Sequence, residues 1–305
     1  MPDVTQLVGR ATALGEAPIW HDGRVLWVDI YEGAVHATTL EGSDEIIAQV
    51  HEPCSAVAPA ESGGLVLATR SGVEFFVEGV RELKWRFAGR PTGARLNDGK
   101  ADPSGRFVVG SMIDADEPPS AELFRLGADL ENADVVGRGL SLSNGLAWSP
   151  DGGLLYHVDT LTKSVFVHRY DRDVGPTGHV ATIDTSAVEG HPDGMTVDVD
   201  GCVWIAFWDG GCVARFTPTG QVDRVVEVPV PRPTSVTFAG DDLDVMVITT
   251  ASFGLDPRAL DRSPLSGSLL AIDSIGSGLT AHTVDVASSA ATGAVSPSRE
   301  GPGHG

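Results

Sequence analysis

A sixfold internal repeat is the feature that most restricts how this chain can fold. The repeated segments share one plan: a small or polar start, a short apolar run, a turn containing Gly or Asp, and a second run of alternating character. This plan is typical of a β-hairpin. The six segments are GEAPIWHDGRVLWVDI, CSAVAPAESGGLVLATR, RLNDGKADPSGRFVVGSM, SNGLAWSPDGGLLYHVDT, PDGMTVDVDGCVWIAFWDGG and TSVTFAGDDLDVMVITTA.

A second pair of strand-like pieces follows the hairpins, as in GAVHATTLEG and SVFVHRYDRD. Four strands per unit, recurring every roughly 40 to 50 residues, match the blades of a β-propeller. The sequence therefore predicts an all-β fold, a six-bladed β-propeller with four-stranded blades around a central channel. A β-sandwich is the alternative, but sandwiches seldom show a repeat of this length. We expect one domain over residues 1–285 and a disordered tail over 286–305, which is rich in Ser, Ala, Gly and Pro.

The charge and the N-terminal residues disfavour several function classes. A formal net charge of -21 at pH 7 disfavours binding to nucleic acid or to an anionic membrane surface and favours attraction of divalent cations. The N-terminal residues show no secretion signal, and no apolar run is long enough to span a membrane. We expect a cytoplasmic protein.

Three cysteines are too few and too irregularly spaced for a disulfide framework or a cysteine metal site. A hairpin turn at Asp209 and Gly210 would place Cys212 opposite Phe207, too far along the ladder to reach Cys202. We therefore expect buried free thiols, which suit a reducing compartment.

Polar residues recur at the start of the first strand in every unit. In a propeller these strands line the channel, so equivalent positions converge on one of its mouths. Each residue alone could be a turn former or a solvated side chain, because Asn-Gly and Asp-Gly are common turn dipeptides. The shared position argues for function. It is occupied by Glu16, Ser55, Asn97, Asn144, Asp193 and, in the sixth unit, Ser235 or its neighbour.

Glu16, Asn144 and Asp193 together offer two carboxylates and one amide oxygen. Oxygen ligands without Cys or His suit Ca²⁺, Mg²⁺ or Mn²⁺. Three protein ligands leave positions free for water and substrate, as in a catalytic metal site.

Arg95 and Asn97 are candidates for hydrogen bonds to a polyhydroxylated substrate, although Asn-Asp-Gly is also a turn signal. Trp208 and Asp209 lie beside the channel strand, and His191 could serve as an acid or base. No Gly-x-Ser-x-Gly elbow, phosphate loop or dinucleotide fingerprint is present.

The segments LGEAPIW, RLNDGKADPSGRFVVGSM, SNGLAWSPDGGLLYHVD and PDGMTVDVDGCVWIAFWDGG resemble, in order, the signature regions of one family. It is the family of regucalcin (senescence marker protein), gluconolactonase and luciferin-regenerating enzyme. The resemblance implies a divalent cation on the propeller axis, Ca²⁺ first and Zn²⁺, Mg²⁺ or Mn²⁺ as alternatives. It matches Glu16, Asn144 and Asp193 to the metal ligands, and Arg95 and Asn97 to residues that contact sugar.

The chain departs from the family where animal members carry paired glutamates after a GTM-like segment. Here the sequence reads GSMIDADEPPSAELF, in which Asp114 or Asp116 could take the substrate-binding role. The shorter acids leave the identity of the substrate open.

Together with these residues, the resemblance implies an enzyme that opens a small-molecule sugar lactone to the aldonic acid through attack of metal-activated water, and it suggests Asp193 as the general base. Three alternatives stay open. They are hydrolysis of another ester or a phosphotriester on the same cation, a non-catalytic Ca²⁺-binding propeller, and a metal-free condensing enzyme similar to strictosidine synthase.

Overall fold

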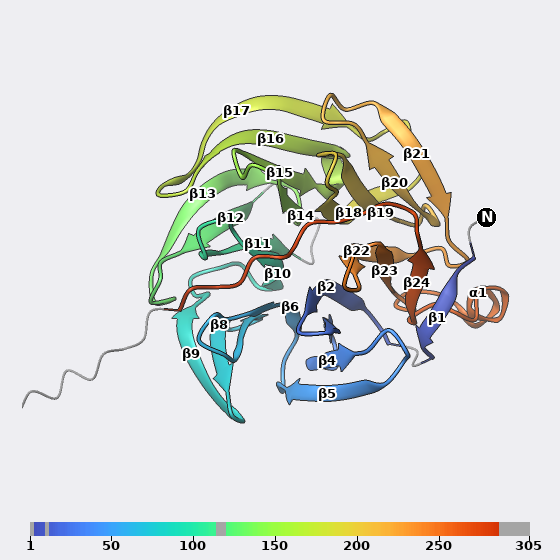
Figure 1. The fold of residues 1–305 in the computed structure, drawn as a ribbon. Coiled ribbons are helices and arrows are strands. Elements are labelled where there is room, and N and C mark those ends of the chain that lie inside the picture. Colours follow the sequence, from blue (N-terminus) through green and yellow to red (C-terminus); the bar gives the residue numbers. More distant parts are fainter. Residues whose placement is uncertain (1–2, 10–11, 114–119, 287–305) are drawn as a thin grey trace, which may run out of the picture.

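The computed structural model describes residues 3–9, 12–113 and 120–286. It folds them as six four-stranded antiparallel sheets set around a central axis (Figure 1). The predicted six-bladed propeller is confirmed. Residues 287–305, nearly all of the expected tail, lie outside the described residues.

The blades follow one another along the chain, each with its first strand innermost. Blade 1 is β2 (Gly15–His21), β3 (Arg24–Asp29), β4 (Ala34–Thr38) and β5 (Asp44–Gln49), and blade 2 is β6 (Cys54–Pro59), β7 (Leu65–Thr69), β8 (Gly72–Val77) and β9 (Val80–Arg86). Blade 3 is β10 (Ala94–Ala101), β11 (Phe107–Ile113), β12 (Ala121–Leu126) and β13 (Ala133–Leu140). Blade 4 is β14 (Ser143–Trp148), β15 (Leu154–Asp159), β16 (Ser164–Asp171) and β17 (Gly175–Asp184), and blade 5 is β18 (His191–Val197), β19 (Val203–Trp208), β20 (Cys212–Phe216) and β21 (Val222–Glu227).

Blade 6 departs from the predicted plan of four consecutive strands. It takes β22 (Pro233–Ala239), β23 (Val245–Thr250) and β24 (Leu269–Asp273) from its own unit, and its outer strand is β1 (Thr5–Val8) from the other end of the chain. Thr5 pairs with Ala271 and Val8 with Leu269. This exchange closes the ring, so that the two ends of the propeller hold each other in register.

The blades have buried faces on both sides, because each packs against its neighbours. Tyr156 and Val165 of blade 4 and Ile205 and Phe216 of blade 5, for example, belong to one apolar cluster and are almost fully buried. This explains why second strands such as β7, LVLAT, and β19, VWIAFW, read as nearly continuous apolar runs rather than as strict alternation.

The inner strands of four blades carry a bulge at the same point. Between Ser143 and Leu146 two residues of β14 lie opposite one residue of β15, and the same irregularity separates Pro192 from Met195 in β18. Blades 1 and 3 repeat it, between Glu16 and Ile19 and between Leu96 and Gly99. A bulge bends the strand and redirects the side chains at that point. The positions inside or beside the four bulges include Glu16, Asn97, Asn144 and Asp193.

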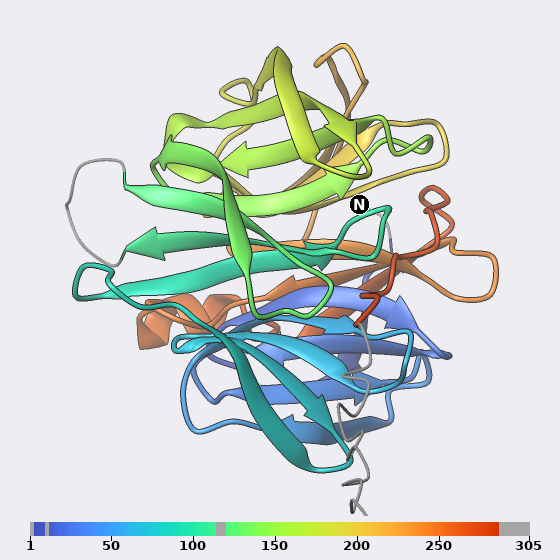
Figure 2. The ribbon, with the colours of Figure 1, turned by 90° about the vertical axis from the view of Figure 1, so that its left-hand side faces the viewer.

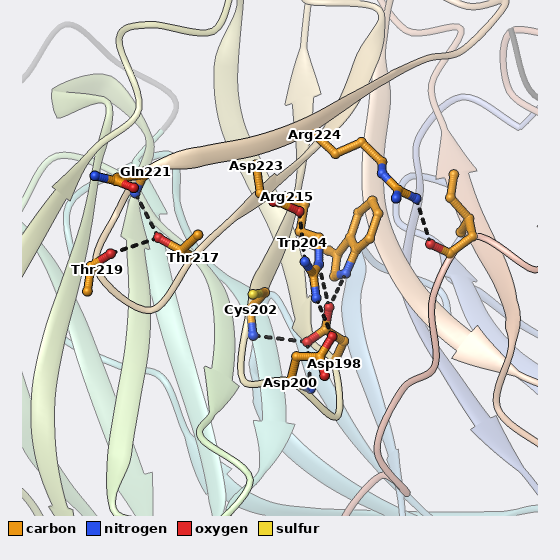
Figure 3. Close-up of polar contacts among 11 residues, drawn as sticks. Asp198, Asp200, Cys202, Trp204, Arg215, Thr217, Thr219, Gln221, Asp223 and Arg224 are labelled. Atoms are coloured by element: carbon orange, nitrogen blue, oxygen red, sulfur yellow. Dashed lines mark hydrogen bonds and ion pairs between the residues drawn. The ribbon is translucent and has the colours of Figure 1, made fainter.

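A buried Asp anchors the turn after the inner strand in blades 3 and 5. In blade 5, Asp198 accepts hydrogen bonds from the backbone N–H of Cys202 at 2.9 Å, from Trp204 Nε1 at 2.8 Å and from Arg215 Nε at 2.7 Å (Figure 3). In blade 3, Asp102 accepts from Arg125 Nε at 2.8 Å. These contacts fix the turn to the third strand of the same blade.

The chain after β24 crosses the hub on one face of the ring, where it runs past β18 and β10 (Figure 1). We call residues 274–286 the strap. Its Ser277 accepts from Val199 N–H of blade 5, and its Val284 pairs with Ala60 of blade 2. The strap and the short helix α1 (Pro257–Arg262) lie on opposite faces (Figure 2). Leu279 to His282 of the strap line a cavity of about 240 Å³ over this end of the channel.

The expected pairing and burial of the cysteines are confirmed. Phe207 pairs with Cys212, as predicted, and Cys54, Cys202 and Cys212 are buried free thiols. Among the described residues, α1 and every other helical segment are too short and too polar to cross a membrane.

Gly194, inside the bulge of β18, provides a test of how closely the inner strands approach. A Cβ at this position would lie 2.0 Å from Ser235 Oγ and 2.8 Å from Ser235 Cα of the next blade. We expect Gly194→Ala to lower the free energy of unfolding by about 1–3 kcal/mol, measured by urea denaturation. Gly178→Ala is the control, because nothing lies within 4 Å of that Cβ. Equal stability of the two variants would contradict this packing.

Candidate active site

The mouth of the channel opposite the strap holds a cavity of about 370 Å³. Its lining comes from the starts of inner strands and from the ends of the second strands, so blades 1, 3, 4, 5 and 6 contribute and blade 2 does not. The lining residues are Leu14, Glu16, Ile30, Tyr31, Arg95, Asn97, Met112, Leu142, Asn144, Thr160, Leu161, His191, Asp193, Trp208, Asp209 and Phe253. The predicted residues Glu16, Arg95, Asn97, Asn144 and Asp193 are all among them.

The acidic and amide residues form the floor of this cavity. Glu16 is 7% exposed and Asp193 is 6% exposed, so both carboxyl groups are almost removed from water. Glu16 is held by its own backbone, because its Oε2 accepts a hydrogen bond of 2.8 Å from the N–H of Ala17. Ala17 has a φ of 48°, in the left-handed region that non-glycine residues rarely adopt. The strained bulge thus orients the Glu16 carboxylate.

Asn144 connects blade 4 to the Asp193 carboxylate of blade 5. Its Nδ2 donates to Asp193 Oδ1 at 2.5 Å and to Thr160 Oγ1 at 3.2 Å. Gly145 follows Asn144 in the same bulge, and a Cβ there would lie 2.5 Å from the Asp193 carbonyl oxygen. Glycine at this position therefore permits the two inner strands to approach closely enough for the side chains to meet.

Burial is the first cause that raises the pKa of both carboxyl groups. The pKa of Glu16 lies well above its usual range, because of burial and then of the negative charges of Asp193 and Asp98. The pKa of Asp193 is also raised by burial and by Asp98, although the hydrogen bond from Asn144 and the charge of Arg95 lower it. The floor thus concentrates negative charge in a place that water does not stabilise.

A third acid and a base lie deeper in the channel. Asp98 is 3% exposed, and burial raises its pKa while the positive charge of Lys100 lowers it. Lys100 Nζ donates a hydrogen bond of 2.5 Å to the carbonyl oxygen of Met195 in blade 5, and Lys100 also lines the cavity under the strap. These two residues separate the floor of the site from the opposite end of the channel.

The donor set of the floor fits a divalent cation. Two buried carboxylates and an amide converge there, and their mutual repulsion would be relieved by two positive charges. Within the described residues, no three His, Cys, Asp or Glu side chains form a cluster that could hold a metal ion. A cation at this floor would therefore need Asn144 as the third protein ligand, which excludes a structural zinc site of the usual kind.

Arg95 and Asn97 lie at one side of the floor and are bonded to each other. Arg95 donates to Asn97 Oδ1 at 2.8 Å, and Asn97 Nδ2 donates to the Ser143 carbonyl oxygen at 3.0 Å. This pairing fixes both side chains before any ligand arrives. The sequence placed them at the mouth but gave no sign that they contact one another.

The two serines of the predicted set serve the packing of the blades. Ser55 and Ser235 do not line the cavity. Ser55 Oγ donates to the Asn97 carbonyl oxygen of the next blade at 2.9 Å, and Ser235 Oγ occupies the space beside Gly194. The expectation that all six equivalent positions converge on the site is therefore wrong for these two blades, whose bulges also differ from the other four.

Several other residues have a place in the cavity. His191, Trp208 and Asp209 line it, as considered from the sequence, and Arg232 stacks over the Trp208 ring at 4.6 Å. Tyr31, Leu161 and Phe253 line it as well, and sequence reasoning missed them. They follow second strands, whereas the predicted residues lie in first strands. Their positions just after the second strand of a repeated unit were the signal in the sequence that could have identified them. Asp114 and Asp116 lie outside the described residues.

Comparison with known proteins places this geometry in a family. Residues 14–252 match the model of the SMP-30/Gluconolactonase/LRE-like region. The chain is 34% identical to 6-deoxy-6-sulfogluconolactonase of Pseudomonas putida over 87% of this chain and 92% of that protein. It is 32% identical to pentonolactonase XacC of Haloferax volcanii, over 87% and 90% respectively. A solved structure described as a calcium-binding protein, regucalcin, from Agrobacterium tumefaciens is 25% identical, with a TM-score of 0.85 over 93% of this chain and 97% of that one. The chain belongs to the SMP-30/gluconolactonase/LRE-like family.

Proposed function

We propose that this protein hydrolyses a sugar lactone to the corresponding aldonic acid at the mouth opposite the strap, with one divalent cation at the floor. The observation that carries the proposal is the convergence of Glu16, Asn144 and Asp193, from three different blades, in one cavity with Arg95 and Asn97. Relatives named sulfogluconolactonase and pentonolactonase support the reaction class, and the calcium-binding regucalcin supports Ca²⁺ as the first choice of cation.

Glu16, Asn144 and Asp193 would hold the cation. When bound, such an ion polarises the lactone carbonyl and lowers the pKa of a water molecule beside it. Asp193 would also take the proton of the attacking water on its carboxylate. The same carboxyl group would return that proton to the ring oxygen as the acyl C–O bond breaks, which leaves one carboxylic acid and one alcohol.

Arg95 and Asn97 would orient the substrate beside these groups. Because each is already fixed by a hydrogen bond to the other, little conformational entropy is lost when they bind ring hydroxyl groups. The small buried floor also limits the water that can reach the carbonyl. The role of Asp114 or Asp116 as a further substrate contact stays a proposal from the family resemblance.

Asp193→Asn tests the proposed base. We expect the substitution to lower kcat on lactones by at least roughly 100-fold, since the amide cannot accept the proton, with an unchanged circular dichroism spectrum. Asp184→Asn, at an exposed carboxylate, is the matched control and should retain full activity.

Prolonged EDTA treatment should abolish turnover, and Ca²⁺ should restore it. Full activity of the Asp193 variant or of the EDTA-treated protein would remove that residue or the cation from the mechanism.

Glu16→Gln tests the electrostatic cost of the floor without any substrate. In EDTA the folded Glu16 carboxyl keeps its proton to higher pH than the unfolded one, so the folded state binds more protons and stability falls as pH rises above the ordinary Glu pKa, about 4.3. We expect Glu16→Gln to be more stable than the wild type at pH 8 and to lose less stability between pH 5 and 8, by urea denaturation. Glu45→Gln, on the exposed outer strand, should show neither effect. A Glu16 variant that is less stable at pH 8 would contradict this account.

Asp98 and Lys100 test the sign of the channel charges. The negative charge of Asp98 should favour the cation and the positive charge of Lys100 should oppose it. We expect Asp98→Asn to weaken Ca²⁺ binding by roughly tenfold and Lys100→Met to strengthen it, by isothermal titration calorimetry. If both substitutions weakened binding, their effect would be structural rather than electrostatic.

A further inference from the structure

The cavity at the functional mouth has two chemically different parts. Its floor is polar and buried, as described above. Its outer edge carries Tyr31, Leu161 and Phe253, which are 38%, 62% and 49% exposed and which line the same cavity. We call these three residues the apolar rim. They follow β3, β15 and β23, so the rim is assembled from blades 1, 4 and 6.

The aromatic members of the rim are unusual for this molecule. Among the large apolar side chains that are exposed in the described part of the chain, Tyr31 and Phe253 are the two aromatic ones. Their ring centroids lie 4.9 Å apart at an interplanar angle of 38°. Single exposed apolar residues are ordinary, but exposed aromatic rings gathered at the edge of a polar cavity mark a surface that binds something.

Two polar side chains near the rim are engaged within the protein, whereas His191 of the same lining keeps a buried Nδ1 without a hydrogen-bond partner among the described residues, and Tyr31 carries a hydroxyl group. Asp209 accepts from Arg232 Nε at 2.6 Å, and Thr160 accepts from Asn144 Nδ2. Ligand hydroxyl groups would thus find partners at the floor and at His191, whereas the outward end of a ligand beside Leu161 and Phe253 would meet carbon.

We propose that the substrate is a lactone whose outward substituent is apolar, a terminal methyl or longer alkyl group in place of the hydroxymethyl group of a common sugar. The inference rests on the proposed function, because it assumes that the lactone carbonyl lies at the floor. A methyl group against the rim exchanges its contact with water for contact with aromatic and aliphatic carbon. A hydroxymethyl group beside Leu161 and Phe253 must be partly dehydrated, because neither side chain offers it a hydrogen-bond partner.

A matched pair of lactones tests the proposal. L-Rhamnono-1,4-lactone and L-mannono-1,4-lactone differ only in a methyl group instead of a hydroxymethyl group. We expect kcat/KM to be roughly tenfold higher for the rhamnonolactone, the order of magnitude for one group in an apolar site. Both would be assayed with Ca²⁺ and then with Zn²⁺, Mg²⁺ and Mn²⁺ by release of acid at constant pH.

Two rim variants and a control assign the preference to the rim. Phe253→Asn and Leu161→Asn should each reduce the ratio of the two kcat/KM values toward one. Val180→Asn is the control, because Val180 is 48% exposed on the outer strand β17 and lies away from the cavity. It should leave both rates and their ratio unchanged.

The outcomes separate the two proposals. A wild-type ratio of one, or a preference for the mannonolactone, would overturn the apolar-rim inference while the lactonase proposal stands. A preference for the rhamnonolactone that survives in both rim variants would also overturn it, because the rim would not be its cause. If neither lactone, nor gluconolactone, xylonolactone or arabinonolactone, were hydrolysed with any of the four cations, the proposed function itself would fail.

Discussion

The bulges in the inner strands are the constraint on which the rest of the site depends. A regular inner strand would alternate its side chains between the two faces of its blade. In blades 1, 3, 4 and 5 two residues instead lie opposite one residue of the neighbouring strand, and the polar side chains at these points meet in the channel. The left-handed backbone conformation of Ala17 allows this geometry in blade 1. Gly145 and Gly194 allow it in blades 4 and 5, because a Cβ at either position would collide with the next blade. The site is therefore a property of the ring as a whole.

The closure of the ring keeps those bulges at fixed distances. β1 completes blade 6 and the strap joins blade 5 to blade 2 across the opposite face. A rigid frame can hold buried carboxyl groups close together. On flexible loops the same groups would move apart and relieve their repulsion. Burial and neighbouring negative charge raise the pKa of Glu16 and Asp193, which means that their ionised forms are destabilised. A divalent cation would stabilise those ionised forms. The fold thus favours binding of a positive charge at the floor, and the family resemblance suggests that a bound cation there would assist lactone hydrolysis.

The sequence predicted the propeller and the shared position of Glu16, Asn144 and Asp193, because both follow from a repeat that can be read directly. It did not predict the outer strand of blade 6, since β1 and β24 stand at opposite ends of the chain. It placed Ser55 at the mouth because a polar residue at an equivalent position looks the same in sequence whether it faces the channel or bonds to a neighbouring blade. The sequence did not predict the apolar rim, because Phe253 lies in a connection that follows the last repeated segment.

A crystal structure of the protein grown with CaCl₂ tests the central claim most directly. The account predicts one ion at the floor of the cavity, with oxygen atoms of Glu16, Asn144 and Asp193 about 2.3–2.6 Å from it. It also predicts that the Asn144 amide turns its oxygen toward the ion. An empty floor at saturating Ca²⁺, or an ion bound only elsewhere on the acidic surface, would contradict it.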